Sequence, residues 1–505
     1  MINIQITPAD FEYDVQSLVQ AFYPGEAFQV NKTQKENSSD DRAVSSDVNK
    51  KENTDSKICR RLNVILGGDK IEFEFNDGKA KYSESVFCDY KDRRETKNIL
   101  KNALYNILSN ATGTTLPWGN LTGIRPAKIP ALMLKEGKSE DEIRQNMKDT
   151  YLISDEKLEL SLDIARRENK LLDNIPYEDG YSLYVGIPFC PTTCLYCSFT
   201  SYPITLYEKL TDSYVDAVIK EMDYVGKALK DKVLNTVYIG GGTPTTLSPK
   251  QLTRLIVELR KHFDFSNVVE FTVEAGRPDS ITREKLVALK ENGVDRISIN
   301  PQTMNQDTLD LIGRRHTVEQ VIEKFNLARE VGFANINMDL IMGLPMEDEE
   351  KVIHTLKEIE KLAPDSLTVH SLALKRAARL NIQKEKYQTM KMENNLKLME
   401  LSESYSKAMD MKPYYLYRQK NMAGNQENVG YSKEGCEGIY NILMMGDKQN
   451  IVALGAGATT KMMSKDRLSA TRIDNVKNVE LYIERIDEMI GRKREYFENN
   501  DFYVD

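Results

Sequence analysis

Between residues 181 and 375 the chain repeats one pattern, which constrains the fold more than any other feature. Short runs rich in β-branched residues alternate with longer helical stretches, and six such runs follow one another. Strands that alternate with helices form a parallel sheet, and strands that are apolar on both faces are typical of a sheet covered by helices. The pattern therefore predicts an α/β fold, with a β/α barrel or part of one. The predicted strands are 182–187, 236–239, 270–274, 296–299, 335–340 and 366–370, and the predicted helices are 204–229, 249–262, 282–291, 305–311, 318–331 and 348–361.

Residues suited to chemistry lie at the ends of these predicted strands. Cys190 follows the first strand, a glycine run at 240–242 follows the second, and Glu274 ends the third. A polar segment at 300–302 follows the fourth strand, and Asp339 lies in the fifth. In β/α barrels the chemistry takes place at the carboxyl ends of the strands. The sequence therefore predicts one site where these ends meet.

Three of the six cysteines are clustered. Cys190, Cys194 and Cys197 have the spacing C-x-x-x-C-x-x-C, and no histidine lies between residues 1 and 261. Thiolates bind soft metals and iron–sulfur clusters, whereas a structural zinc site usually takes four ligands, often as two separated pairs. Three cysteines on a 4Fe–4S cluster leave one iron open to a small molecule. The spacing favours such a cluster over zinc or a chance grouping.

This cysteine motif resembles the signature of the radical S-adenosylmethionine (SAM) enzymes. The resemblance implies that the three cysteines bind a 4Fe–4S cluster and that SAM chelates the fourth iron. In that family the reduced cluster cleaves SAM to methionine and a 5′-deoxyadenosyl radical, which abstracts a hydrogen atom from the substrate, so an electron donor is also implied. The expected architecture is a partial (β/α)6 TIM-like barrel of the radical SAM type at 176–375. An N-terminal α+β domain at 1–175 and a C-terminal α+β extension at 376–505, which covers the substrate, would flank it.

The later motifs, taken in order, resemble one subfamily, the oxygen-independent coproporphyrinogen III oxidases and their relatives. By this resemblance Gly241, Gly242 and Thr243 contact the SAM amino group. Glu274 would hold the same amino group or the adenosine. Taken alone, a glycine run can equally serve a tight strand–helix turn, and Glu274 could be a solvated carboxylate.

The same resemblance implies roles for five further residues. Gln302 and Arg314 would face the SAM carboxylate, for which a guanidinium group is well shaped. Asp339 would accept hydrogen bonds from the ribose hydroxyls. Tyr184 and Tyr196 take the aromatic positions beside the cluster and the adenine. The catalytic residue that touches the substrate is not identified by the motifs.

The resemblance extends beyond the predicted barrel. The loop at 117–126 and the segments 417–431 and 455–458 are similar to the HemZ-type branch of the family, the coproporphyrinogen dehydrogenases. The implied reaction in heme biosynthesis is oxidative decarboxylation of two propionates of coproporphyrinogen III, which gives protoporphyrinogen IX. A tetrapyrrole with four propionates needs cations in its site, although each cation could also be a solvated surface charge. The candidates are Arg125, Lys375, Arg376, Arg379 and Arg418.

Two alternatives stay open because the chain departs from the family pattern. The oxidases carry a fourth cysteine one residue beyond the third, where this chain has Cys197–Ser198–Phe199. The protein could be a radical SAM enzyme with another substrate, such as a methyltransferase or a tetrapyrrole-modifying enzyme. It could also be a heme-binding carrier without decarboxylase activity. A sister branch that handles heme typically has an H-N-x-x-Y-W motif near its C-terminus, which is absent here.

The flanking segments and the composition complete these expectations. The polar segment 32–57 is predicted to be a disordered loop, strands with hairpin turns at 67–68 and 76–78 are predicted within 60–90, and helices are predicted at 91–110, 127–174, 384–411 and 475–491. The net charge of −8, without a basic tract, argues against nucleic acid or an anionic membrane as the main partner. No apolar run approaches the ~18 residues of a membrane span, and no signal peptide is visible. We therefore expect a cytoplasmic protein.

Overall fold

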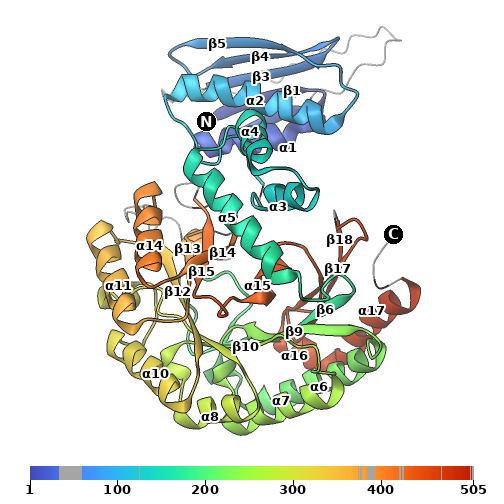
Figure 1. Ribbon diagram of the computed structural model, residues 1–505, viewed down its shortest axis with the longest axis vertical. Coiled ribbons are helices and arrows are strands. Elements are labelled where there is room, and N and C mark those ends of the chain that lie inside the picture. Colours follow the sequence, from blue (N-terminus) through green and yellow to red (C-terminus); the bar gives the residue numbers. More distant parts are fainter. Residues whose placement is uncertain are drawn as a thin grey trace, which may run out of the picture. The chain divides into compact units, whose positions relative to one another are not determined.

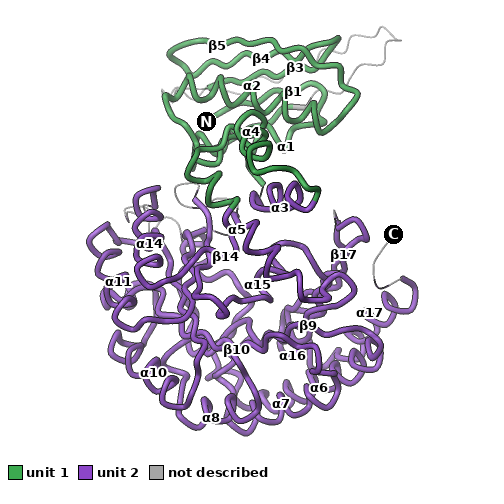
Figure 2. Tube along the Cα trace, in the orientation of Figure 1, with its two compact units in different colours: residues 1–123, 136–162 green, residues 124–135, 163–505 purple. Residues whose placement is uncertain are grey.

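The computed structural model describes residues 1–32, 60–123, 125–373, 375, 378–383, 390, 392, 394–419, 422, 426–467, 469–500 and 502. These residues form two compact units, one made of residues 1–123 and 136–162 and the other of residues 124–135 and 163–505 (Figure 2). The loop predicted at 32–57 lies outside the described residues, apart from Lys32 at its start. The division into three domains with boundaries after residues 175 and 375 stays a prediction.

The first unit is built on a five-stranded mixed sheet. Its strands are β1 (Ile2–Thr7), β2 (Phe28–Lys32), β3 (Arg60–Gly67), β4 (Lys70–Asn76) and β5 (Lys81–Phe87), and its helices are α1 (Glu12–Phe22), α2 (Arg93–Thr112) and α4 (Glu140–Tyr151). The strand order is β2-β1-β3-β4-β5. The pairs β3–β4 and β4–β5 are antiparallel, so both predicted hairpins are confirmed. Alternate apolar residues of β1, β3 and β4 form one core with α1 and α2.

In the second unit the six predicted strands are confirmed as parallel neighbours. They are β6 (Gly180–Ile187), β9 (Val233–Gly241), β10 (Glu270–Gly276), β11 (Arg296–Ile299), β12 (Asn335–Met342) and β13 (Ser366–Ser371). They pair in sequence order, each parallel to the next. Their carboxyl ends therefore lie at one edge of the sheet. The sheet ends in β14 on one side and β18 on the other and does not close on itself, so the α/β fold with a partial barrel is confirmed.

The intervening helices run around the outside of these strands (Figure 1). They are α6 (Thr211–Ala228), α7 (Pro249–His262), α8 (Arg283–Glu291), α9 (Gln306–Leu311), α10 (Val318–Val331) and α11 (Glu349–Leu362). α7 and α10 begin sharply because Ser248 with Gln251, and Thr317 with Gln320, form capping boxes that satisfy the first free N–H groups. α6 begins seven residues later than predicted because two short 3-10 turns precede it.

Strands from the C-terminal segment extend this sheet at both edges. The added strands are β14 (Lys412–Tyr417), β15 (Asn428–Ser432), β16 (Asn450–Leu454), β17 (Thr459–Met463) and β18 (Ala470–Asp474). β15 pairs antiparallel with β13 at one edge, and β16 pairs parallel with β6 at the other. β16 is therefore a seventh parallel strand, which the β/α pattern did not predict. The remaining elements are α3 (Lys128–Lys135), α5 (Asp155–Leu172), α12 (Arg379–Ile382), α14 (Leu396–Ala408), α15 (Ile439–Met445), α16 (Val479–Glu484), α17 (Ile486–Asn499), and the short strands β7 (Phe189–Cys190) and β8 (Tyr202–Pro203).

The end of the chain differs from the prediction. The single helix predicted at 475–491 is two helices, α16 and α17, and α17 continues to Asn499. The inward face of α17 carries Lys493, whose side chain is fully buried and pairs with Glu221 of α6 at 2.7 Å. A lysine on the buried face interrupts the apolar period of α17 two residues beyond the predicted end.

No helix in the described part of the chain combines the length and the apolar character that crossing a bilayer requires.

Candidate cluster and cofactor site

The three clustered cysteines lie in a loop at the carboxyl end of β6. Cys194 is buried, and Cys190 and Cys197 are half-buried. Two other segments hold the loop: the Leu195 N–H donates to the Ile312 carbonyl at 2.9 Å, and the Leu380 N–H donates to the Leu195 carbonyl at 3.0 Å. The loop is therefore fixed by its neighbours from both sides.

The surroundings of these cysteines favour the protonated thiol as long as no metal is bound. Burial raises the pKa of the Cys190 thiol to about 11 and also raises the pKa of Cys197. Metal binding replaces the thiol proton, and an iron–sulfur cluster binds each thiolate through a different iron. None of the three cysteines is in a disulfide. The donor set, three soft ligands on one loop, fits a cluster with one open iron.

The glycine run at the end of β9 is clamped to the strand that leads into this loop. The Gly242 N–H donates to the Ile187 carbonyl at 2.8 Å, and the Thr243 N–H donates to the Phe189 carbonyl at 2.7 Å. A Cβ on Gly242 would lie 2.5 Å from the Phe189 carbonyl oxygen. Gly241 has a φ of +110°, a conformation that favours glycine. The Thr243 hydroxyl reaches Cys190 Sγ at 3.5 Å.

Glu274 lies beside this glycine run. Tyr238 donates its hydroxyl to Glu274 Oε1 at 2.5 Å. Burial raises the pKa of Glu274 to about 7, and the hydrogen bond from Tyr238 only partly opposes this effect. A Cβ on Gly240 would lie 3.0 Å from the Glu274 carboxyl carbon, so the backbone of the glycine run and the carboxyl group are close neighbours. The carboxyl group can hold or release a proton near neutral pH.

Arg314 binds both Tyr196 of the cysteine loop and the backbone of Asn300, which lies two residues before Gln302. Arg314 Nη1 donates to the Tyr196 hydroxyl at 3.1 Å, and Nη2 donates to the Asn300 carbonyl. Within the described residues, Gln302 Oε1 and Arg314 Nε are buried without a hydrogen-bond partner. Buried polar groups are normally paired, so an acceptor and a donor are left here for a polar ligand. The Arg314 donor fits the carboxylate of SAM, and the Gln302 acceptor fits an N–H donor such as its amino group.

Asp339 lies on β12 beside Gln302. The Gln302 N–H donates to the Asp339 carbonyl at 3.0 Å. Burial favours the neutral carboxyl, but the His370 imidazole, 3.9 Å away, and the Asn337 amide, at 2.7 Å, outweigh it. The pKa of Asp339 therefore lies below its ordinary value. An ionised carboxylate can accept two hydrogen bonds from adjacent ribose hydroxyls.

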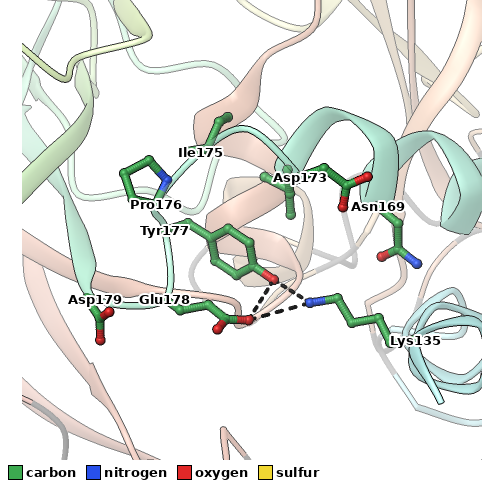
Figure 3. Close-up of a pocket in the computed structure, with 9 residues that line it drawn as sticks. Lys135, Asn169, Asp173, Ile175, Pro176, Tyr177, Glu178 and Asp179 are labelled. Carbon is green, nitrogen blue, oxygen red and sulfur yellow. Dashed lines mark hydrogen bonds and ion pairs between the residues drawn. The ribbon is translucent and has the colours of Figure 1, made fainter.

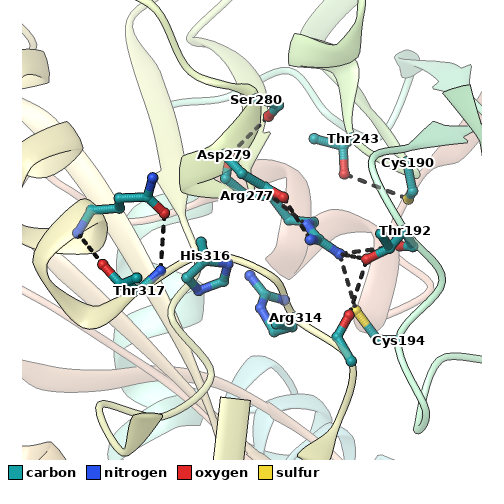
Figure 4. A network of polar contacts seen from close by, with 12 residues as sticks. Cys190, Thr192, Cys194, Thr243, Arg277, Asp279, Ser280, Arg314, His316 and Thr317 are labelled. Atoms are coloured by element: carbon teal, nitrogen blue, oxygen red, sulfur yellow. Dashed lines mark hydrogen bonds and ion pairs between the residues drawn. The ribbon is translucent and has the colours of Figure 1, made fainter. Parts of the chain in front are cut away.

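Four residues near the site were not predicted from the sequence. The Tyr440 ring of α15 stacks on Tyr238 at 4.5 Å, Tyr238 bonds Glu274, and His370 faces Asp339. Arg277 donates toward Cys194 Sγ at 3.7 Å (Figure 4). Tyr238 lies two residues before Gly240, so the period of two along a strand could have placed it on the same face. Tyr440 carries no such signal, because it comes from a helix far along the chain.

The candidate propionate cations are separated by the fold. Lys375 lies over the Phe199 ring at 5.6 Å, and Arg379 Nη1 donates to the Thr193 carbonyl at 3.5 Å, so both contact the cysteine loop. Two candidates are engaged elsewhere: Arg125 is ion-paired with Asp447, and Arg418 is buried beside Glu427. The fifth candidate, Arg376, lies outside the described residues.

Two cavities flank β6. One of about 240 Å³ lies at its carboxyl end and is lined by Tyr184, Gly241, Phe199 and Lys477, so predicted site residues border it. The other, of about 330 Å³, lies before the amino end of β6 around Lys135 and Tyr177 (Figure 3). None of the predicted site residues lines this second cavity.

Comparison with known proteins places the chain in a family. A model of the radical SAM superfamily matches residues 184–359. The oxygen-independent coproporphyrinogen-III oxidase-like protein HemZ of Bacillus subtilis (strain 168) is 43% identical over 439 residues, 86% of this chain and 88% of that protein. The chain belongs to the HemZ family of radical SAM proteins. The heme chaperone HemW of the same strain is 33% identical over 310 residues, 61% of this chain and 76% of HemW. The solved coproporphyrinogen III oxidase (HemN) of Escherichia coli, a radical SAM enzyme, is 23% identical with a TM-score of 0.49, over 62% of this chain and 71% of that chain.

Membership in this family confirms the predicted cofactors. Radical SAM proteins use a 4Fe–4S cluster and SAM, and both predictions stand. The residues that bind each cofactor stay predictions, supported by the geometry of the strand ends. The predicted resemblance to the HemZ branch is also confirmed.

Proposed function

We propose that this protein is an oxygen-independent coproporphyrinogen III oxidase, which converts two propionates of coproporphyrinogen III to vinyl groups. The observation that carries the proposal is the convergence of the cysteine loop, the glycine run, Glu274, Gln302 and Arg314 at the carboxyl ends of neighbouring parallel strands. The choice of substrate is supported by the similarity to HemZ over most of both chains.

In this proposal Cys190, Cys194 and Cys197 hold the cluster. When bound, the cluster and SAM supply the one-electron and hydrogen-abstraction chemistry. The protein's own contribution is to orient SAM. The Gly241–Thr243 backbone and Glu274 bind its amino group, and Arg314 and the amide N–H group of Gln302 bind its carboxylate. Asp339 binds its ribose hydroxyls, and Tyr184 and Tyr196 flank the cluster and the adenine.

Lys375 and Arg379 are the proposed partners of the substrate propionates. Both contact the cysteine loop, so a propionate bound to either would lie near the reacting centre. Lys375 is exposed, so an anionic substrate group can reach it. Each propionate loses CO2, one β-hydrogen atom and one further electron, which passes to a one-electron acceptor, and a vinyl group remains.

A second candidate function is heme transport without decarboxylation. Two observations favour it: the 33% identity to a heme chaperone, and Phe199, 70% exposed, at the position where the oxidases have a fourth cysteine. An exposed aromatic ring beside the cysteine loop could pack on the flat face of a heme.

An anaerobic product assay distinguishes these functions. The reconstituted protein is incubated with SAM, dithionite and coproporphyrinogen III, and the porphyrin products are analysed by mass spectrometry. Loss of two formic-acid equivalents supports the oxidase. Formation of 5′-deoxyadenosine without a porphyrin product would instead indicate another substrate, and stoichiometric heme binding with neither product would indicate the carrier.

Cysteine variants test the cluster site itself. We expect Cys194→Ala to lose the visible absorbance of the cluster and the bound iron. Cys436→Ala is the matched control, because Cys436 is a free cysteine outside the loop. Unchanged iron content in Cys194→Ala would refute the cluster site.

A further inference from the structure

Arg277 follows the end of β10 and is almost fully buried, with 3% of its surface exposed. Its guanidinium group forms a forked pair with Asp279, in which Nε lies 3.0 Å from Oδ1 and Nη2 lies 2.7 Å from Oδ2 (Figure 4). Because the guanidinium is planar and this fork uses one edge, the direction of the opposite edge is fixed.

The remaining nitrogen of Arg277 faces the cysteine loop. Nη1 donates to the Thr192 hydroxyl at 2.7 Å, to the Thr192 carbonyl at 3.1 Å, and toward Cys194 Sγ at 3.7 Å. The other contact drawn on a loop cysteine is the neutral Thr243 hydroxyl at Cys190 (Figure 4). Arg277 therefore brings a full positive charge to one cysteine sulfur.

The groups around Arg277 do not cancel this effect. Asp279 binds the opposite edge, so its negative charge lies farther from Cys194 than the positive charge does. His316 lies nearby, and burial together with the Arg314 charge lowers its pKa to about 3, so it is neutral at working pH. Arg314, which bonds Tyr196, adds a second positive charge on the same side of the network (Figure 4).

We propose that Arg277 is a positioning residue that raises the reduction potential of the cluster by donating a hydrogen bond to Cys194. Asp279 orients Arg277, and its negative charge partly offsets this increase in potential. One-electron reduction by an external reductant adds one negative charge to the cluster and its thiolates. A donor with a positive charge at a ligand sulfur stabilises that charge, and hydrogen bonds to sulfur are among the factors that set such potentials. The inference rests on the proposed cluster site at the three cysteines.

The test is a dithionite redox titration of the reconstituted protein, followed by the EPR signal of the reduced cluster. We expect Arg277→Gln to lower the one-electron equilibrium constant for reduction at least tenfold, a shift of 59 mV to more negative potential. Asp279→Asn should shift the potential to a more positive value, because it removes the negative charge that partly offsets Arg277. Arg277→Lys keeps the charge and should fall between the wild type and Arg277→Gln.

Opposite shifts in Arg277→Gln and Asp279→Asn separate electrostatic tuning from a merely structural role, which would move both variants in the same direction. Arg283→Gln is the matched control, because Arg283 forms an exposed pair with Glu330 and should leave the potential unchanged. Equal potentials in wild type, Arg277→Gln and Asp279→Asn at full iron content would overturn the proposal. If Arg277→Gln loses iron, the test rests on the potential of Asp279→Asn alone. An unchanged or more negative potential in Asp279→Asn then overturns the proposal. Failure of the underlying cluster-site proposal is a separate result, because it would appear as unchanged iron content in Cys194→Ala.

Discussion

Replacing Lys493 by methionine is expected to destabilise the second compact unit by about 3 kcal/mol. Lys493 and Glu221 have no exposed side-chain surface, and their charges are 2.7 Å apart. Removing one partner of such a buried pair typically costs about 3–5 kcal/mol, because the other charge stays buried without compensation. Glu221 would keep hydrogen bonds from Asn475 at 2.9 Å, the Gly455 N–H at 2.9 Å and the Tyr482 hydroxyl at 2.6 Å. These three bonds place the expected cost at the lower end of that range.

The double variant Lys493→Met with Glu221→Gln sharpens this prediction. A neutral glutamine removes the uncompensated charge, so the double variant should be more stable than the sum of the single effects predicts, by about 1–3 kcal/mol. The measurement is urea unfolding followed by far-UV circular dichroism. Trp118 lies in the first unit, so tryptophan fluorescence reports on that unit and serves as an internal comparison.

Additive single effects would refute the reasoning, because they would mean that the two side chains do not share one electrostatic interaction. A loss below about 1 kcal/mol in Lys493→Met would also contradict it, since an ordinary exposed ion pair contributes that little.

Three further predictions concern the candidate site. Gly242→Ala should abolish SAM binding, measured by calorimetry, because its Cβ would lie 2.5 Å from the Phe189 carbonyl oxygen; Gly67→Ala, with open space at its Cβ, should not change it. Glu274→Gln should weaken SAM binding yet stabilise the protein at pH 8, by up to about 3 kcal/mol, and much less at pH 5. The folded-state pKa of about 7 lies above the ordinary value of 4.5. The stability that this carboxyl contributes is therefore full below about pH 4.5 and is lost as the pH rises through 7. Equal urea midpoints for wild type and Glu274→Gln at pH 8 would contradict this. Lys375→Gln should raise the KM for coproporphyrinogen III severalfold and leave the SAM affinity unchanged; a loss of SAM affinity in this variant would argue against a substrate role.

The sequence predicted the parts of the fold that depend on local pattern. The six parallel strands and the placement of Glu274 and Asp339 follow from β-branched runs and from the rule that strand carboxyl ends share one edge. β16 could not be predicted in the same way, because its partner β6 precedes it by more than 250 residues and strand pairing at that distance leaves no local signal. Tyr440 and Lys493 escaped prediction for a related reason: the tyrosine stack and the buried ion pair are made by tertiary contacts.

The pairing of β16 with β6 has a consequence for the order of events during synthesis. β6 and the cysteine loop leave the ribosome early, but the strand that covers the outer edge of β6 is made about 263 residues later. At ordinary rates of translation of about 5–20 residues per second, this interval lasts roughly 13 to 50 s. Tyr214 of α6 donates its hydroxyl to the Gly186 carbonyl at 2.6 Å and accepts a hydrogen bond from the Ala456 N–H. This second bond can form only after Ala456 has been synthesised. The nascent chain therefore presents its cysteines before the core around them is complete, and cluster delivery during translation would have that interval in which to act.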